Sequence, residues 1–397
     1  MDAKMLAQLY HPSPVVLDVS KGICREPVRP AEFQVNKFTQ EFDYSTLFFD
    51  AFFDDEGANV IFIGPSFFNL LPYVSNMTIT AFPSRNKCPF RIKNMDRLSQ
   101  VWATVPDQTN LVTIESGLGR FEISPNRNFS HRFANKRVLV TLSKNNRLEW
   151  ITDWVRYNRD VHGANAVLFY DNVSSIYRPE ELLNALTSIA GIDCVCVVVW
   201  PFKYGPQGFD AERFWDSDFC QHGAMEHSRW IGLQQARSVL NSDIDELVVS
   251  ESNSSIFAAA ERSWAGTVRY PGVWVYGIEG QTRQSSQEAP YRFTDFDHYL
   301  RPGIRKKFGF LSILEDVCPT KWAVVPSRCP ENAQWTAHRI KGWIGAIPKS
   351  KDFCYRHFRE ISDHWKYHRT GGQAFGVNRF EYDKLTASAY SHVDWRS

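Results

Sequence analysis

From Arg137 onward, the chain alternates apolar runs with segments whose apolar residues recur at helical spacing. Leu148, Ile151 and Trp154 follow this spacing, whereas the apolar runs indicate strands buried on both faces. The predicted strands are 138–142, 166–170 and 193–200, with a fourth opening at Asp243, and the predicted helices are 147–159, 179–189 and 219–240. Alternating strands and helices imply a mainly parallel sheet with right-handed crossovers and ligands at the carboxyl ends of the strands. We therefore predict an α/β fold.

The first 135 residues follow a different pattern. Apolar runs predict strands at 59–64, 77–80 and 111–114, with Pro65 at a helix start. The polar stretch 124–132 marks a domain boundary. We predict a smaller α/β domain over residues 1–135, followed by a catalytic domain over residues 136–397.

Composition limits the class of protein. The formal net charge of +1 supplies no broad field for binding nucleic acid. The eight cysteines lack a Cys-x-x-Cys pair and dense spacing, which is typical of reduced thiols in a cytoplasmic protein. The start of the chain does not resemble a signal peptide, and no apolar window is long enough to span a membrane. We expect at most peripheral membrane association.

The cluster Asp243-Ile244-Asp245-Glu246 carries the most specific chemistry. Carboxylates two residues apart on a strand point the same way, so Asp243 and Asp245 can share Mn²⁺ or Mg²⁺ and hold a diphosphate against it. The same spacing places Glu246 on the opposite face. The alternative interpretation is a solvated strand end.

Other polar residues follow the predicted strands. Asn145 and Asn146 stand where the first strand meets its helix, and either contact a base or cap the helix. Asp171 and Asn172 end the second strand, where Asp171 either accepts from a nucleoside or caps a turn. Lys321 is a candidate phosphate contact, although a charged run is usually a solvated face.

Together these segments resemble GT-A glycosyltransferases, in particular glycosyltransferase family 92 and related bacterial family-2-like enzymes. The resemblance covers about 137–372 and rests on 144–146, 153–158, 162–163, 170–174, Gln221, 243–246, 274–277 with Gly280, 292–294, 321–326 and His338. Asn146, Asp153 and Asn158 depart from the family's Glu, Glu and His. The resemblance implies a GT-A-like αβα sandwich and makes His338 a third metal ligand or a diphosphate contact.

An inverting transferase needs a carboxylate base for the acceptor hydroxyl. Glu279 and Glu288 are the candidates by position, with rivals at Asp295, Asp297, Glu315 and Asp316. We predict a metal-dependent, inverting transfer from a UDP-sugar to a glycan acceptor, either a surface polysaccharide or a glycolipid.

Two alternative functions remain open. A nucleotidyltransferase or pyrophosphorylase acting on sugar phosphates would want a glycine-rich loop, and residues 143–146 lack glycine. A non-catalytic nucleotide- or glycan-binding protein would keep the fold without the reaction.

Overall fold

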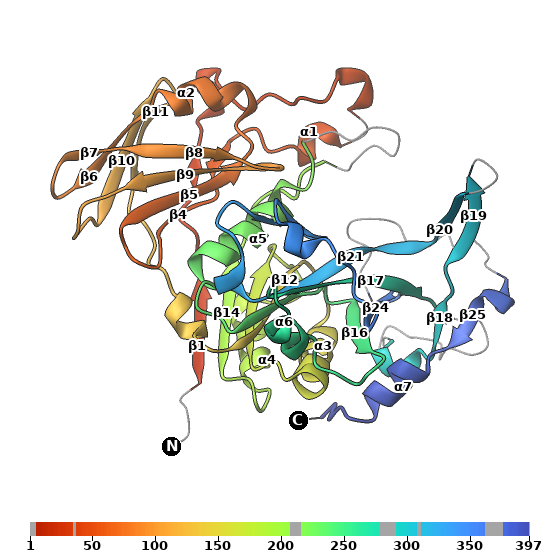
Figure 1. The fold of residues 1–397 in the computed structure, drawn as a ribbon. Coiled ribbons are helices and arrows are strands. Elements are labelled where there is room, and N and C mark those ends of the chain that lie inside the picture. Colours follow the sequence, from red (N-terminus) through yellow and green to blue (C-terminus); the bar gives the residue numbers. More distant parts are fainter. Residues whose placement is uncertain are drawn as a thin grey trace.

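The computed structural model describes residues 5–34, 37–206, 216–277, 291–307, 311–361 and 376–396. A nine-stranded sheet in the order β1-β14-β13-β12-β15-β21-β17-β24-β16 forms its centre (Figure 1). The sheet is mixed and mostly parallel, so the prediction of an α/β fold is confirmed at that level.

The parallel part of the sheet contains the predicted alternation of strands and helices. Its strands are β12 (Arg137–Ser143), β13 (Ala166–Asp171), β14 (Cys194–Val199) and β15 (Ser238–Asn241), and its helices are α3 (Leu148–His162), α4 (Pro179–Thr187) and α5 (Phe219–Ile231). The chain adds β13 and β14 on one side of β12 and then returns to add β15 on the other. This reversal creates a topological switch point between β12 and β15, the place where open α/β sheets bind ligands.

Apolar side chains cover both faces of these strands. Val138 and Val140 pack in the cluster that contains α5, whereas Leu139, between them, packs with α3 and α4. Strands covered by helices on both faces bury every residue, which explains their continuous apolar runs.

The sheet continues on both edges with other strands. β15 is followed by β21 (Val317–Val324), β17 (Thr267–Val275), β24 (Phe353–Phe358) and β16 (Glu246–Ser250), and three of these four junctions are antiparallel. At the opposite edge, β1 (Leu6–Tyr10) pairs in parallel with β14. The first residues described therefore belong to the large sheet.

One predicted helix was too long. The segment 219–240 forms α5 only as far as Ile231, and after Gly232 it enters the four-residue strand β15. All four β15 residues are buried between β12 and β21, so they show no alternation of polar and apolar positions. A strand this short and fully buried resembles a helix segment in sequence.

The rest of the N-terminal region is built mostly from antiparallel strands, unlike the predicted α/β domain. Its elements are β2 (Val15–Val16), β3 (Thr46–Phe48), β4 (Asp50–Phe53), β5 (Asn59–Pro65), β6 (Thr78–Phe82), β7 (Asn86–Cys88), β8 (Phe90–Asn94), β9 (Leu98–Thr104), β10 (Leu111–Ser116), β11 (Gly119–Ile123), α1 (Phe38–Glu41) and α2 (Leu71–Ser75). They form two four-stranded sheets, β4-β5-β9-β8 and β11-β10-β6-β7, and the β2–β3 pair. Pro65 ends a strand, so the predicted helix start there was wrong.

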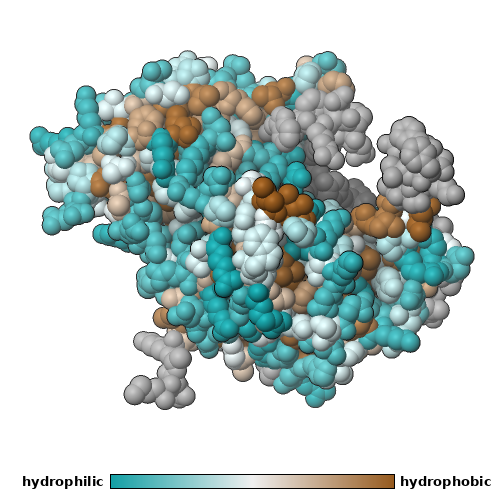
Figure 2. All heavy atoms as spheres, viewed as in Figure 1, coloured by the Kyte–Doolittle hydropathy of each residue, from teal (hydrophilic) through white to brown (hydrophobic). Residues whose placement is uncertain are grey.

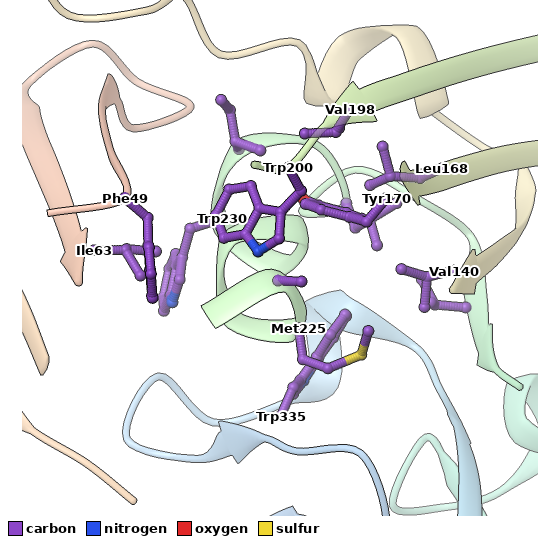
Figure 3. Close-up of a cluster of buried hydrophobic side chains, with 14 of the residues drawn as sticks. Phe49, Ile63, Val140, Leu168, Tyr170, Val198, Trp200, Met225, Trp230 and Trp335 are labelled. Atoms are coloured by element: carbon purple, nitrogen blue, oxygen red, sulfur yellow. The ribbon is translucent and has the colours of Figure 1, made fainter. Parts of the chain in front are cut away.

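A shared core joins the N-terminal sheets to the large sheet. Phe49 and Ile63 come from the N-terminal region and lie beside Trp200 and Trp230 of the central fold (Figure 3). The Phe49 and Trp200 ring centroids are 5.3 Å apart.

The remaining elements follow β16 in the sequence. They are α6 (Ile256–Arg262), β18 (His298–Leu300), β19 (Gly303–Lys307), β20 (Leu311–Glu315), β22 (Gln334–Trp335), β23 (Ile340–Lys341), the 3-10 turn η7 (Ile344–Ala346), β25 (Phe380–Tyr382) and α7 (Lys384–Tyr390). Within the described ranges, every helix is too short or too polar to cross a membrane.

Candidate functional site

The acidic cluster lies at the switch point. Asp243 and Asp245 occupy the connection that leaves the carboxyl end of β15 and enters β16, so Asp243 does not open a strand as predicted. Asp243 is partly exposed, whereas Asp245 is largely buried. The nearly buried Ile244 between them anchors the turn. The tertiary fold thus places two carboxylates where a ligand is expected in this topology.

Glu246 belongs to the same cluster, which corrects its predicted placement on the opposite face. Its carboxylate accepts a hydrogen bond from the backbone N–H of Asp243 at 2.9 Å. The Nζ of Lys321 lies 3.2 Å from Glu246 Oε2 and 2.7 Å from Asp243 Oδ2. Lys321 reaches this position from β21, on the far side of β15.

Burial and charge determine the protonation of this group. Burial lowers the pKa of Lys321, but Asp243 and Glu246 outweigh that effect and raise the pKa above its ordinary value. Burial raises the pKa of Glu246, against the opposing effect of Lys321. The raised pKa favours the protonated form of Lys321 beside Asp243, Asp245 and Glu246, which we call the acidic turn.

His357 is the histidine that the structure places beside Asp245. Its Nε2 lies 3.0 Å from Asp245 Oδ2, and its ring stacks on Trp274 with centroids 4.3 Å apart. The two rings come from the parallel neighbours β17 and β24, where Trp274 and His357 are register partners. Stacking on Trp274 holds the His357 ring in the orientation that points Nε2 toward Asp245.

The loops after β12 and β13 lie against each other at the same edge. Asn145 has a left-handed backbone (φ +56°), its N–H donates to Ser174 Oγ at 2.8 Å, and its Oδ1 accepts from Ser175 N at 2.7 Å. Asn146 donates to Ser143 Oγ at 2.8 Å. These two side chains hold the rim together; their predicted contacts with a nucleotide stay predictions.

Asp171 and Asn172 also make local contacts. Asp171 accepts from Ser174 Oγ at 2.6 Å and from Ser174 N at 3.1 Å, the turn cap that was its alternative interpretation. Asn172 donates to the carbonyl oxygens of Trp200 and Phe202. Burial raises the pKa of Asp171, partly offset by the hydrogen bonds from Ser174.

An open cavity of about 350 Å³ lies beside these two loops. Its lining residues are Arg147, Leu148, Glu149, Ile176 and Tyr177. Arg147 precedes α3, and Tyr177 lies with its hydroxyl 3.3 Å from Asp171 Oδ1. The cavity thus opens at the carboxyl ends of β12 and β13.

The predicted metal ligands are only partly brought together. Among the described residues, no three His, Cys, Asp or Glu side chains gather closely enough to hold a metal by themselves. His338 is exposed, and its backbone carbonyl accepts from Thr320 Oγ1 at 2.8 Å. Asp243 and Asp245 stay the predicted ligands of a hard cation, because Mg²⁺ characteristically binds one or two carboxylates and takes its other ligands from water and substrate phosphates.

The two leading candidates for the base, Glu279 and Glu288, lie outside the described residues. Among their rivals, Asp297 lies 2.7 Å from His298, and Asp316 pairs with Arg379 at 3.0 Å. Asp295 and Glu315 are described as well: Asp295 accepts from the Arg292 N–H, and Glu315 ends β20.

Glu360 is a candidate that sequence reasoning missed. It follows β24, and its Oε1 accepts from the backbone N–H of Gly277 at 3.0 Å, while its buried Oε2 has no hydrogen-bond partner among the residues that the structure describes. The backbone N–H of Phe358, two residues earlier, donates to Asp245 O at 2.8 Å, so the chain contacts the acidic turn shortly before it reaches Glu360. Burial raises the pKa of Glu360, and the hydrogen bond from the Gly277 N–H partly offsets that rise. Its sequence signal was its place two residues after the His357-Phe358 pair.

Comparisons with known proteins are sparse. No protein-family model matches the chain, and no curated protein matches it. A solved structure of an active-site mutant of LgtC, a GT-A glycosyltransferase, matches with 13% sequence identity and a TM-score of 0.24. The match covers 48% of this chain and 58% of that chain, less than two thirds of its length. At that TM-score the likeness carries no weight for fold or function.

Proposed function

We propose that this protein is a glycosyltransferase that uses a nucleotide-diphosphate sugar and Mn²⁺ or Mg²⁺. The observation that carries the proposal is the position of Asp243 and Asp245 at the carboxyl end of β15, beside the switch point with β12. Ligands of open α/β sheets bind at this point, and paired carboxylates there suit a cation that holds a diphosphate.

In this proposal the residues of the acidic turn have separate roles. Asp245, oriented by His357, and the partly exposed Asp243 hold the cation, with His338 as the further predicted ligand. The cation supplies positive charge to the departing diphosphate. Lys321 keeps the turn together by compensating the charges of Asp243 and Glu246.

In the same proposal, the nucleoside binds at the rim formed by the loops after β12 and β13. The cavity beside Arg147 and Tyr177 offers an aromatic ring and a guanidinium for a base. We assign uridine to it, with Asn145 and Asp171 as its polar surroundings. The acceptor is a glycan or glycolipid, assembled at the cytosolic side of a membrane.

Glu360 is our choice for the group that takes the proton of the acceptor hydroxyl. Its carboxylate accepts from Gly277 N just after β17 ends, two residues beyond the backbone contact of Phe358 with Asp245, and one of its oxygens has no partner among the described residues. A base with a raised pKa accepts a proton more readily at neutral pH. Glu279 and Glu288 remain predicted alternatives.

The test is hydrolysis or transfer with a panel of nucleotide sugars, measured with Mn²⁺, with Mg²⁺ and with excess chelator. Asp245→Ala should lose metal-dependent turnover by about a hundredfold or more, since a charge-stabilising group is lost from the transition state. Asp18→Ala, in an exposed pair with Lys21 in the N-terminal region, is the matched control and should stay close to wild type. Full wild-type turnover in chelator would contradict the metal, and formation of a nucleotide sugar from UTP and a sugar phosphate would favour the nucleotidyltransferase alternative.

A further inference from the structure

Three large apolar side chains stand exposed on two adjoining loops. Trp264, after α6, is 86% exposed, and Ile344 and Ile347, at η7, are 83% and 60% exposed. The loops touch, because a Cβ built on Gly345 would lie 2.8 Å from the Cβ of Ala265. We call these three residues and the exposed cations around them the Trp264 patch. Figure 2 shows apolar side chains grouped near the middle of one face, bordered by hydrophilic surface.

The surroundings of the Trp264 patch are basic. Residues 332–351 contain no Asp or Glu. The exposed cations of the patch are Arg262, Arg328, Lys349 and Lys351. Arg328 is held there, because its Nη1 donates to the backbone oxygens of Glu261 and Ser263.

Of two carboxylates near the patch, one is paired with cations and the other accepts hydrogen bonds from uncharged groups. Glu261 is paired with Arg137 at 2.8 Å and Arg237 at 2.7 Å. Asp352 accepts hydrogen bonds from Ser252 at 2.7 and 2.8 Å. The four exposed cations outnumber these two carboxylates, so the patch presents apolar side chains within a surface of net positive charge.

We propose that the Trp264 patch docks the protein on an anionic membrane surface. Trp and Ile side chains that project from a loop can enter the headgroup region, and flanking Lys and Arg meet anionic lipids. A second copy of the chain fits less well, because a symmetric pairing would set like charges of the two patches against each other.

The patch is connected to the acidic turn through a short chain of contacts. Arg269 donates from Nη1 to Ile347 O at 3.0 Å and from Nε to Thr320 Oγ1 at 2.9 Å. Thr320 precedes Lys321, whose ammonium pairs with Asp243. Docking through the patch would therefore hold the acidic turn in a defined relation to the bilayer, where a lipid-linked acceptor is available. The docking itself does not depend on the proposed reaction.

The test is co-sedimentation of the full chain with phosphatidylcholine vesicles, with and without phosphatidylglycerol. The wild-type protein should bind the anionic vesicles, and salt should weaken the binding. Trp264→Ser and Ile344→Asp should each lower the partition coefficient about tenfold, and Lys349→Glu and Lys351→Glu about fivefold each.

Val28→Asp is the matched control, because Val28 is an exposed apolar residue in the N-terminal region and should leave binding unchanged. Soluble-donor hydrolysis by the patch variants should equal wild type, so failure of docking and failure of the proposed function are distinguishable. No binding by the wild-type protein, or equal binding by Ile344→Asp, would overturn the proposal. So would a wild-type dimer that Ile344→Asp converts to monomer.

Discussion

At the scale of single residues, the carboxylates of the acidic turn are each paired with a basic side chain from another strand. Three carboxylates occur within four positions, and buried Lys321 lies within ion-pair distance of two of them, Asp243 and Glu246. His357 contacts the third, Asp245. A buried carboxylate without such a partner would be costly, which explains why distant strands contribute both groups. Asp243 retains solvent exposure and so can meet a ligand.

Glu360→Gln tests whether this single residue is the catalytic base. The substitution keeps the shape of the side chain and removes the proton acceptor, so turnover should fall about a hundredfold with unchanged donor affinity. The measurement is single-turnover transfer together with donor binding by calorimetry. Glu279→Gln and Glu288→Gln are measured in parallel; a loss confined to one of them would assign the base there instead.

At the scale of elements, the end of α3 is tied to its neighbours by one buried histidine. His162 lies 2.9 Å from Val248 O in β16 through Nε2, and the backbone N–H of Ile256 in α6 approaches its Nδ1 at 3.4 Å. This arrangement suits a neutral ring that donates from Nε2 and accepts at Nδ1. Burial lowers the pKa of His162 to about 4.

The stability of the protein should therefore decline in mild acid. The folded-state pKa lies below the ordinary value, so the His162 contribution is complete above about pH 6.5 and is lost as pH falls toward 4, by about 3 kcal/mol. Urea unfolding of wild type and His162→Gln at several pH values checks this. The variant should show a shallower decline, and parallel curves for the two proteins would refute the assignment.

At the scale of the whole molecule, a buried polar network joins the N-terminal sheets to the central fold. Asp50 of β4 accepts from Tyr10 of β1 at 2.5 Å, and its Oδ2 lies 2.7 Å from Nε2 of His227 in α5. His227 Nδ1 lies 2.7 Å from the hydroxyl of Tyr170 in β13. Four elements from both regions are thus joined through the carboxylate of Asp50 and the imidazole of His227, beside their shared apolar core.

Asp50→Ala should destabilise the whole molecule. It leaves several buried polar groups unpaired, so the free energy of unfolding should fall by about 3 kcal/mol or more. Asp107→Ala, at an exposed turn, should change it by only about 0.5 kcal/mol. Trp fluorescence during urea unfolding measures both, and equal effects of the two substitutions would argue against a joining role for Asp50.

The amino-acid sequence by itself determined β12, β13 and β14 with the helices α3 and α4, because long buried runs and helical spacing are local signals. It also singled out Asp243 and Asp245. Only the tertiary structure decided that 238–241 is a strand, that β1 completes the large sheet, and that Lys321 and His357 meet the acidic turn. The reason is physical: these contacts join strands that are far apart in the chain, and pairing and burial between distant segments leave no period in the local sequence.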